Sequence, residues 1–297
     1  MKNALKKVYY KLQPAALKPG YRLALGFLFH TERIYSNPIF EALISFCQHY
    51  IDTTGKRPLC SVMSPTNSRV RLEMIKSGFS QADFVKRLEE LGAYADIGYH
   101  GHFWRAETDF DNPDNQIKNV NYQHHDDGLI WQQFDLDYSW LARQHFTLPY
   151  YAAGWWFMNS AVLSKLIKEK IEADFSYTKL RWVSNSYCKS FLEDHHIRFG
   201  QPFRLSGSGA VITCIQTLMG CPNSPFPQDI IRLLNTYLEE YDTPIGMVVT
   251  HDYNLIEGEN LKYNKEMISY LQDQKNVSLH SAGELVALGA LAPLKKI

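Results

Sequence analysis

Short apolar runs alternate along the chain with longer segments in which apolar residues recur at helical spacing. This alternation is typical of an α/β fold, in which helices connect parallel strands. The predicted strands are Leu23–Phe29, Pro58–Met63, Tyr94–Gly98, Ala173–Phe175, Ile197–Gly200, Ile245–Thr250 and Val277–Leu279.

Residues that favour the N-cap position precede three of the predicted helices: Ser80, Asn159 and Ser281. Asp83 falls in the first turn of the helix that Ser80 starts, and Glu284 stands three residues after Ser281, which predicts a capping box for the last helix. We also expect Gly92 to end a helix and Pro227 to occupy a first helical position. The Asp-rich segment from Glu107 to Asp127 reads as a long polar loop, either a functional rim or a solvated excursion.

Two histidines stand at the end of the third predicted strand. His100 and His102 follow the Gly98 turn, at the carboxyl edge where α/β proteins build their sites. Neutral imidazole binds zinc and also titrates near neutral pH. This pair therefore indicates either metal binding or acid–base chemistry, and the alternative is a pair of hydrogen-bonded loop histidines.

Composition narrows the class of protein. The 297 residues carry no net charge, so nothing global favours binding to nucleic acid or to an anionic membrane. No apolar run is long enough to span a bilayer, and the four lysines of Met1–Lys11 flank no apolar core of a signal peptide. Five scattered cysteines without CxxC spacing predict reduced thiols. We expect a cytoplasmic protein with a basic extension (1–20) and a single domain (21–297).

Five segments, in chain order, resemble the motifs of NodB-type polysaccharide deacetylases, within the branch associated with surface polysaccharides. They are Leu28–Glu32, Ile97–Trp104, Tyr151–Trp156, Asp174–Tyr177 and Thr250–Leu255. The resemblance implies a distorted (β/α)7 barrel. It also implies removal of acetyl groups from N-acetylated sugars, with a divalent metal held by one Asp and two His.

Several of the family's functional positions carry other residues in this chain. His30 stands where the family has its catalytic-base Asp, and Thr31 stands where most members have the ligand Asp. Glu32 matches a branch whose motif ends in Glu. In the next two motifs, Trp104 replaces the second ligand His, and Ala152 replaces an Arg that orients the catalytic Asp.

A rearranged active site can still be written from the remaining residues. His100, His102 and Glu32 would hold the metal, for which zinc is the expected ion, and His30 or Glu32 would accept a proton from water. His251 would protonate the leaving amine. The resemblance also implies that Asp174 and Leu255 line the pocket, while Trp155 and Trp156 either stack on the sugar or pack in the core.

Two further functions remain open at this point. One is a catalytically inactive pseudo-deacetylase that keeps the barrel and binds glycan or a partner protein. The other is a metal-independent hydrolase or lyase that uses His30 and His251 as an acid–base pair. For the active enzyme, the family resemblance implies a nucleotide- or lipid-linked sugar substrate in surface-glycan assembly. The residues leave the particular sugar and the oligomeric state open.

Overall fold

Parallel strands close into a barrel in the computed structural model, which describes residues 17, 20, 22–108, 116–121, 127–178, 200–219, 224–237, 244–292 and 294–296. In this part of the chain the barrel has seven strands. They are β1 (Leu23–Thr31), β2 (Leu59–Val62), β3 (Asp96–Gly101), β6 (Tyr150–Ala153), β7 (Ala173–Tyr177), β9 (Ala210–Met219) and β10 (Ile245–His251). Because β10 pairs with both β9 and β1, the ring is closed. The predicted distorted (β/α)7 barrel is confirmed.

Residues of β1 alternate between the barrel interior and the surrounding helices. Phe27 and Phe29 pack in the outer hydrophobic cluster, whereas Leu28 belongs to the inner cluster with Leu59 and Ala152. Both faces of β1 are therefore buried, which explains its nearly continuous apolar sequence. The same alternation directs the side chain of His30, two positions after Leu28, into the barrel mouth.

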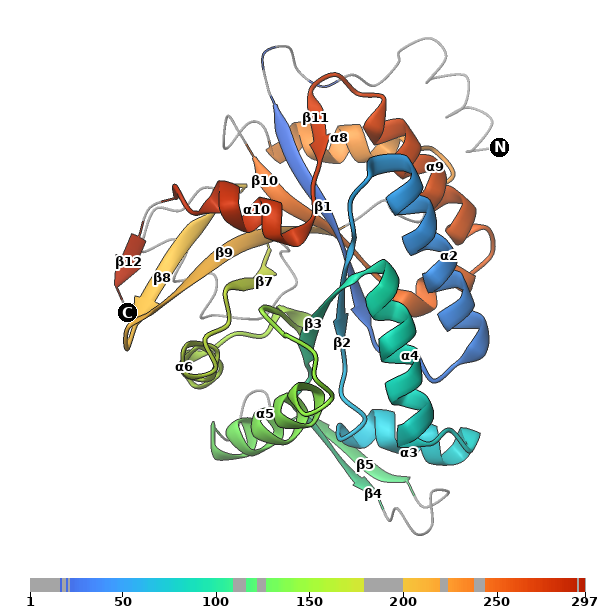
Figure 1. Ribbon diagram of the computed structural model, residues 1–297, viewed down its shortest axis with the longest axis vertical. Coiled ribbons are helices and arrows are strands. Elements are labelled where there is room, and N and C mark those ends of the chain that lie inside the picture. Colours follow the sequence, from blue (N-terminus) through green and yellow to red (C-terminus); the bar gives the residue numbers. More distant parts are fainter. Residues whose placement is uncertain are drawn as a thin grey trace.

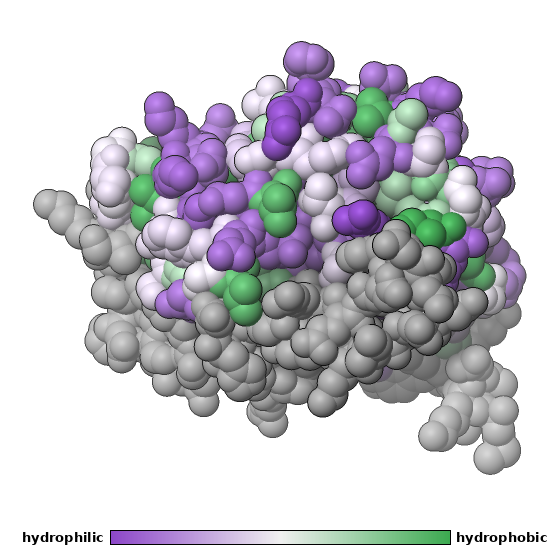
Figure 2. Space-filling model, turned by 90° about the horizontal axis from the view of Figure 1, so that it is seen from below, coloured by the Kyte–Doolittle hydropathy of each residue, from purple (hydrophilic) through white to green (hydrophobic). Residues whose placement is uncertain are grey.

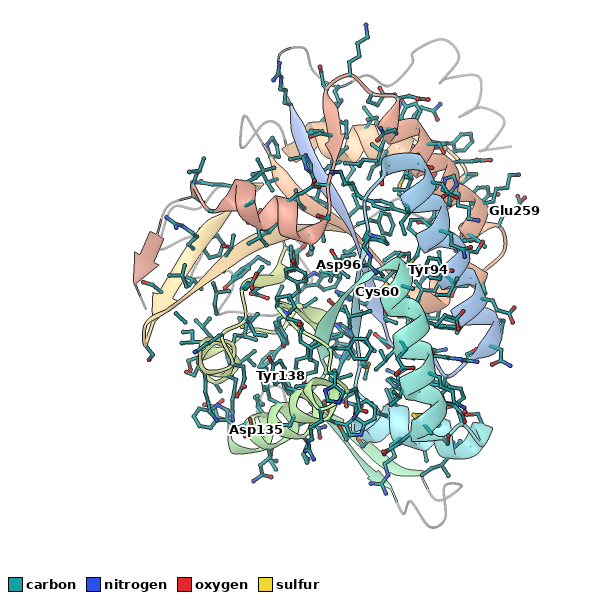
Figure 3. The ribbon with its side chains drawn as sticks, in the orientation of Figure 1. Cys60, Tyr94, Asp96, Asp135, Tyr138 and Glu259 are labelled. Carbon is teal, nitrogen blue, oxygen red and sulfur yellow. The ribbon has the colours of Figure 1, made fainter. Side chains whose placement is uncertain are left out.

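Helices surround the barrel, and side chains fill the space between the helices and the strands (Figures 1 and 3). They are α2 (Asn37–Thr54), α3 (Ser68–Ser77), α4 (Gln81–Tyr94), α5 (Asp127–Ala142), α6 (Ser160–Lys168), α8 (Gln228–Tyr237), α9 (Asn260–Gln272) and α10 (Ala282–Gly289). Helix α2 contacts both α4 and α9 on one side of the barrel (Figure 1). Helix α10 contributes Ala282 and Leu285 to the inner cluster and so covers the amino end of the strands.

Smaller elements complete the fold. They are β4 (Trp104–Thr108), β5 (Gln116–Asn121), β8 (Phe203–Gly207), β11 (Val277–Leu279), β12 (Leu294–Lys296), and the 3-10 turns η2 (Gly154–Trp156) and η3 (Asp252–Ile256). None of the helices in the described ranges is long and apolar enough to cross a bilayer. Among the described residues, those visible in Figure 2 are mainly hydrophilic, with hydrophobic residues scattered among the polar ones.

The structure confirms the predicted helix starts. Ser80 and Ser281 each form a capping box, with Asp83 and Glu284 respectively, and Asn159 Oδ1 accepts a hydrogen bond from the backbone of α6. The predicted stop at Gly92 is wrong, because α4 continues to Tyr94 and ends where the chain extends into β3. Pro227 lies directly before α8 rather than at its first residue.

The prediction of an unbroken polar loop from Glu107 to Asp127 is also wrong. Strands β4 and β5 form an antiparallel ladder there, and α5 begins at Asp127. A ladder joins backbone groups, so polar side chains do not prevent it. Strands β6, β8 and β9 were not predicted as strands. The predicted strand Ile197–Gly200 lies outside the described residues except for Gly200, and most of the predicted extension 1–20 also lies outside them.

Candidate metal centre

The carboxyl ends of three barrel strands bring histidines together, as the sequence predicts. The register of β1 with β10 places His30 opposite His251, and their ring centroids are 5.2 Å apart. His100, at the end of β3, stacks on His30 with centroids 4.2 Å apart. His102 follows β3 and lies edge-on to His100 at 4.7 Å. The four rings share one end of the barrel.

The carboxylate of Glu32 lies at the centre of this histidine cluster. Its Oε1 is 3.3 Å from His102 Nε2 and 3.7 Å from the Nε2 atoms of both His100 and His251. Donor atoms of Glu32, His100 and His102 all lie within 4.8 Å of one another, and the three residues are buried. Four ligands placed tetrahedrally at roughly 2.0–2.1 Å from zinc are separated by about 3.4 Å. The observed separations are therefore close to those of a zinc site.

A backbone hydrogen bond fixes the ring of His100. Its Nδ1 lies 2.9 Å from the carbonyl oxygen of Ala152, so Nδ1 carries the proton and donates it to that oxygen. The opposite nitrogen, Nε2, is buried without a hydrogen-bond partner among the described residues. A histidine whose second nitrogen donates to a carbonyl is a typical oriented metal ligand. The residues present thus fit a divalent metal.

Neighbouring elements position His102. Asn67 Nδ2 donates to the backbone oxygen of His102 at 2.8 Å, while Asn67 Oδ1 caps α3. The ring lies against Gly154, where a Cβ atom would be only 2.3 Å from ring atoms. Because Gly154 has no side chain, there is room for the ring of His102, which stands two positions before Trp104.

The electrostatics of the cluster suit a metal site. Burial by itself raises the pKa of Glu32, but the interactions of its carboxylate with the rings of His100 and His102 outweigh burial and hold that pKa below its ordinary value. Burial lowers the pKa of His30 and of His102, and it lowers the pKa of His251 to about 4. At neutral pH the cluster accordingly combines an ionised Glu32 carboxylate with neutral imidazoles at His30, His102 and His251.

The two tryptophans occupy different environments. Trp156 is buried in the inner cluster, 5.6 Å from the His30 ring, and its Nε1 donates to Thr217 Oγ1 at 2.7 Å. It therefore packs as a fixed inner wall. Trp155 is 54% exposed and has a left-handed backbone with φ of 52°. Stacking of a sugar on Trp155 stays a prediction.

The structure does not bring Asp174 and Leu255 to the histidines. Asp174 pairs in register with Tyr151, whose ring lies near Tyr99 on the helix-facing side of the sheet. Asp174 Oδ1 accepts hydrogen bonds from the backbone and the hydroxyl of Ser176. Leu255 packs in the outer cluster. A pocket-lining role for these residues stays a prediction without a described contact to the centre.

Replacing Asp174 with asparagine is expected to stabilise the protein at high pH. Burial raises the pKa of Asp174 to about 7, whereas in the unfolded chain it is about 4. Between these pH values the unfolded chain loses a proton that the folded chain keeps, so stability falls as pH rises. Asp174→Asn lacks this titration. Thermal melts should show a midpoint several degrees above wild type at pH 8, and little or no gain at pH 4. An equal shift at both pH values would contradict the assignment.

Sequence reasoning missed several residues that support the centre. Asn67 caps α3 and Arg69 lies in its first turn, where no strand-end position marks them. Gly154 becomes informative only once the ring of His102 is seen to pack against it. Asp252 follows the predicted His251 directly. It accepts backbone hydrogen bonds from Arg33 and Tyr253, both at 2.8 Å, and so ties the end of β1 to η3.

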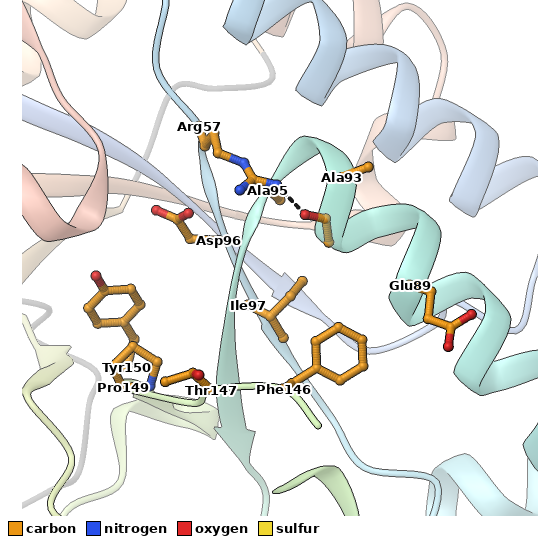
Figure 4. A pocket seen from close by; sticks show the side chains of 11 residues that line it. Arg57, Glu89, Ala93, Ala95, Asp96, Ile97, Phe146, Thr147, Pro149 and Tyr150 are labelled. Carbon is orange, nitrogen blue, oxygen red and sulfur yellow. Dashed lines mark hydrogen bonds between the residues drawn. The ribbon is translucent and has the colours of Figure 1, made fainter. Parts of the chain in front are cut away.

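A separate surface hollow of about 630 Å³ lies at the amino end of β3, the end opposite the histidines (Figure 4). Its lining includes Arg57, Asp96 and Tyr150, and Arg57 donates to the carbonyl oxygen of Gly92. Because parallel-barrel sites lie at the carboxyl ends of strands, we assign no chemistry to this hollow.

Comparison with known proteins supports the fold. No protein-family model matches the chain, and no curated protein matches it. It is similar to the crystal structure of a probable polysaccharide deacetylase from Pseudomonas aeruginosa PAO1, with a TM-score of 0.52 and 11% identity over 91% of this chain and 92% of that one. Puue allantoinase gives 0.53 and 10% identity over 91% of each chain.

A third similar structure is a 4-alpha-glucanotransferase from Thermococcus litoralis, with a TM-score of 0.58 and 10% identity. The match covers 93% of this chain and 42% of the glucanotransferase, so the chain spans less than half the length of that enzyme. At these identities the three likenesses show a shared NodB-like barrel architecture.

Proposed function

We propose that this protein is a metal-dependent hydrolase that removes N-acetyl groups from a sugar in surface-glycan biosynthesis. The observation that carries the proposal is the buried group of Glu32, His100 and His102, with His30 and His251 in contact with it. The names of two similar structures, a probable polysaccharide deacetylase and an allantoinase, agree with hydrolytic chemistry on this barrel.

Glu32, His100 and His102 would hold the metal, and their oxygen and nitrogen donors favour zinc. A bound divalent metal would lower the pKa of water to roughly 7 and so supply a nucleophile at neutral pH. As a ligand with a lowered pKa, the Glu32 carboxylate is a poor proton acceptor. The proton of the attacking water therefore falls to a histidine.

His30 and His251 provide the proton transfers that amide hydrolysis needs. His30 Nε2 is buried without a hydrogen-bond partner in the described part of the chain, so it is available to accept a proton. The side chain of His251 is 21% exposed, more than those of Glu32, His100 and His102, which supports its assignment as the acid that protonates the leaving amine. Since burial keeps His251 neutral, the proton that it donates to the amine would be the one that His30 takes from the attacking water, passed between the two neighbouring rings.

Glycan binding without catalysis is the second candidate function. It is favoured by Trp155, a largely exposed aromatic ring next to the buried Trp156. It is also favoured because Trp104 and Ala152 stand where the family has a metal-ligand His and an Arg that orients the catalytic Asp. Exposed aromatic rings offer apolar faces on which sugars can stack.

Metal analysis combined with an acetate-release assay separates the two functions. Protein purified without chelator should contain one zinc, or another divalent transition metal, per chain, and should release acetate from N-acetylated sugars. Chelation should abolish that release, and added zinc should restore it. A chain that binds no metal and releases no acetate, yet still binds sugar, would replace the hydrolase with the glycan-binding protein.

A further inference from the structure

A guanidinium group borders the open side of the centre. Arg69 Nη1 lies 4.0 Å from Glu32 Oε2, whereas the contacts of three histidines are with the other oxygen, Oε1. The side chain of Arg69 is 33% exposed. It therefore connects the buried carboxylate with solvent.

A second guanidinium, that of Arg33, follows the end of β1 and lies near the partly exposed His251 through the ring of Tyr253. The guanidinium carbon of Arg33 lies 4.6 Å from the centre of the Tyr253 ring. Tyr253 in turn stacks on His251, with centroids 4.9 Å apart and an angle of 29°. The charges of Arg33 and Arg69 both act on Tyr253 and on Tyr35, so both cations lie near these two tyrosines.

The described acidic groups near Arg33 and Arg69 are largely committed to other partners. Asp252 accepts hydrogen bonds from the backbone of Arg33 and Tyr253. Glu32 faces the histidines and is a proposed metal ligand. Among the described residues, the remaining carboxyl that acts on Tyr35 is Glu73 of α3. With a divalent metal bound at Glu32, the described part of the chain would set two guanidinium groups against one peripheral carboxylate, that of Glu73.

We propose that the substrate carries an oxyanion, a phosphate or a carboxylate, which Arg33 and Arg69 bind beside the metal centre. The inference rests on the proposed function and specifies its substrate class: an anionic N-acetylated sugar. Guanidinium groups match phosphate and carboxylate through paired N–H donors, and such charged hydrogen bonds are stronger than neutral ones. Tyr253 and His251 then form the wall along which the sugar approaches Glu32.

Calorimetric titration with three sugars tests this inference. The probes are N-acetylglucosamine, which is neutral, N-acetylglucosamine 6-phosphate, and N-acetylmuramic acid, which carries a carboxylate. Each is titrated into metal-free and zinc-loaded protein, in wild type and in Arg33→Gln, Arg69→Gln and the double variant. Arg71→Gln is the matched control, because Arg71 is an exposed residue of the same helix.

At least one anionic sugar should bind about tenfold or more tightly than the neutral sugar, as expected for charged hydrogen bonds. Each single variant should lose most of that preference and the double variant all of it, while Arg71→Gln keeps it. Comparison of the phosphate with the carboxylate identifies the preferred oxyanion. Equal affinity for all three sugars, no binding of any of them, or a preference that survives in the double variant would overturn the inference. Since the metal-free titration requires no catalysis, its result is distinct from a failure of the deacetylase assay.

Discussion

Replacing His100 with alanine is expected to remove both the bound metal and the deacetylase activity, whereas replacing His251 should remove the activity alone. His100 offers a buried Nε2 to the Glu32 and His102 group, with its ring held by the Ala152 carbonyl. His251 contacts the same carboxylate but lies on the open side, where we assign it proton transfer. Loss of general acid–base catalysis lowers kcat by about 10²–10⁴-fold.

Zinc content by atomic spectroscopy and acetate release by a coupled assay distinguish the two variants. His145→Asn is a suitable control, because His145 is exposed, precedes the amino end of β6, and has a left-handed backbone that Asn tolerates. The control should keep both metal and activity. If His100→Ala retained stoichiometric metal and full turnover, the metal centre assigned here would be wrong. If His251→Ala retained full turnover, its role in proton transfer would be wrong.

The barrel was predictable because its strands are buried on both faces and therefore read as short apolar runs. The run Leu23–Phe29 predicted β1 almost to its end, and Val277–Leu279 matches β11. Strand β9 (Ala210–Met219) was missed, although it pairs with β7, β8 and β10. Its hairpin with β8, through Ser208 and Gly209 at positive φ, is local in the sequence, whereas its parallel partners β7 and β10 lie farther away, and a local pattern carries no information about those two.

The strand-end histidines were predictable for a related reason. Parallel strands of a barrel all point the same way, so His30, His100 and His251 had to share one mouth once their strands were assigned. The face of a side chain is harder to predict, since it depends on register: Asp174 pairs with Tyr151 and faces the helices. The contact of Arg69 with Glu32 depends on how α3 packs, which the sequence pattern does not show.

Adding one methyl group at Gly154 is expected to weaken metal binding without unfolding the barrel. The Cβ of Gly154→Ala would lie 2.3 Å from the ring of His102, so the ring must move away from Glu32 and His100. The backbone of Gly154 is outside the left-handed region, so alanine is otherwise tolerated. Displacing a ligand through its supporting shell typically costs 10–100-fold in metal affinity. The overpacking itself should destabilise the fold by about 1–3 kcal/mol.

Competition with a chelating indicator measures the zinc affinity, and thermal melts confirm that the variant folds. Gly92→Ala is the matched control, because Gly92 lies within α4 and its added methyl would meet only the ring of Phe146, at 3.3 Å. Its zinc affinity should equal that of wild type. The double variant Gly154→Ala, His102→Ala should bind zinc no more weakly than His102→Ala alone, since the methyl group acts through the His102 ring. If the losses of zinc affinity in the two single variants added up in the double variant, Gly154 would act on another ligand. If Gly154→Ala bound zinc as tightly as wild type, the ring of His102, as placed against Gly154, would not be a ligand.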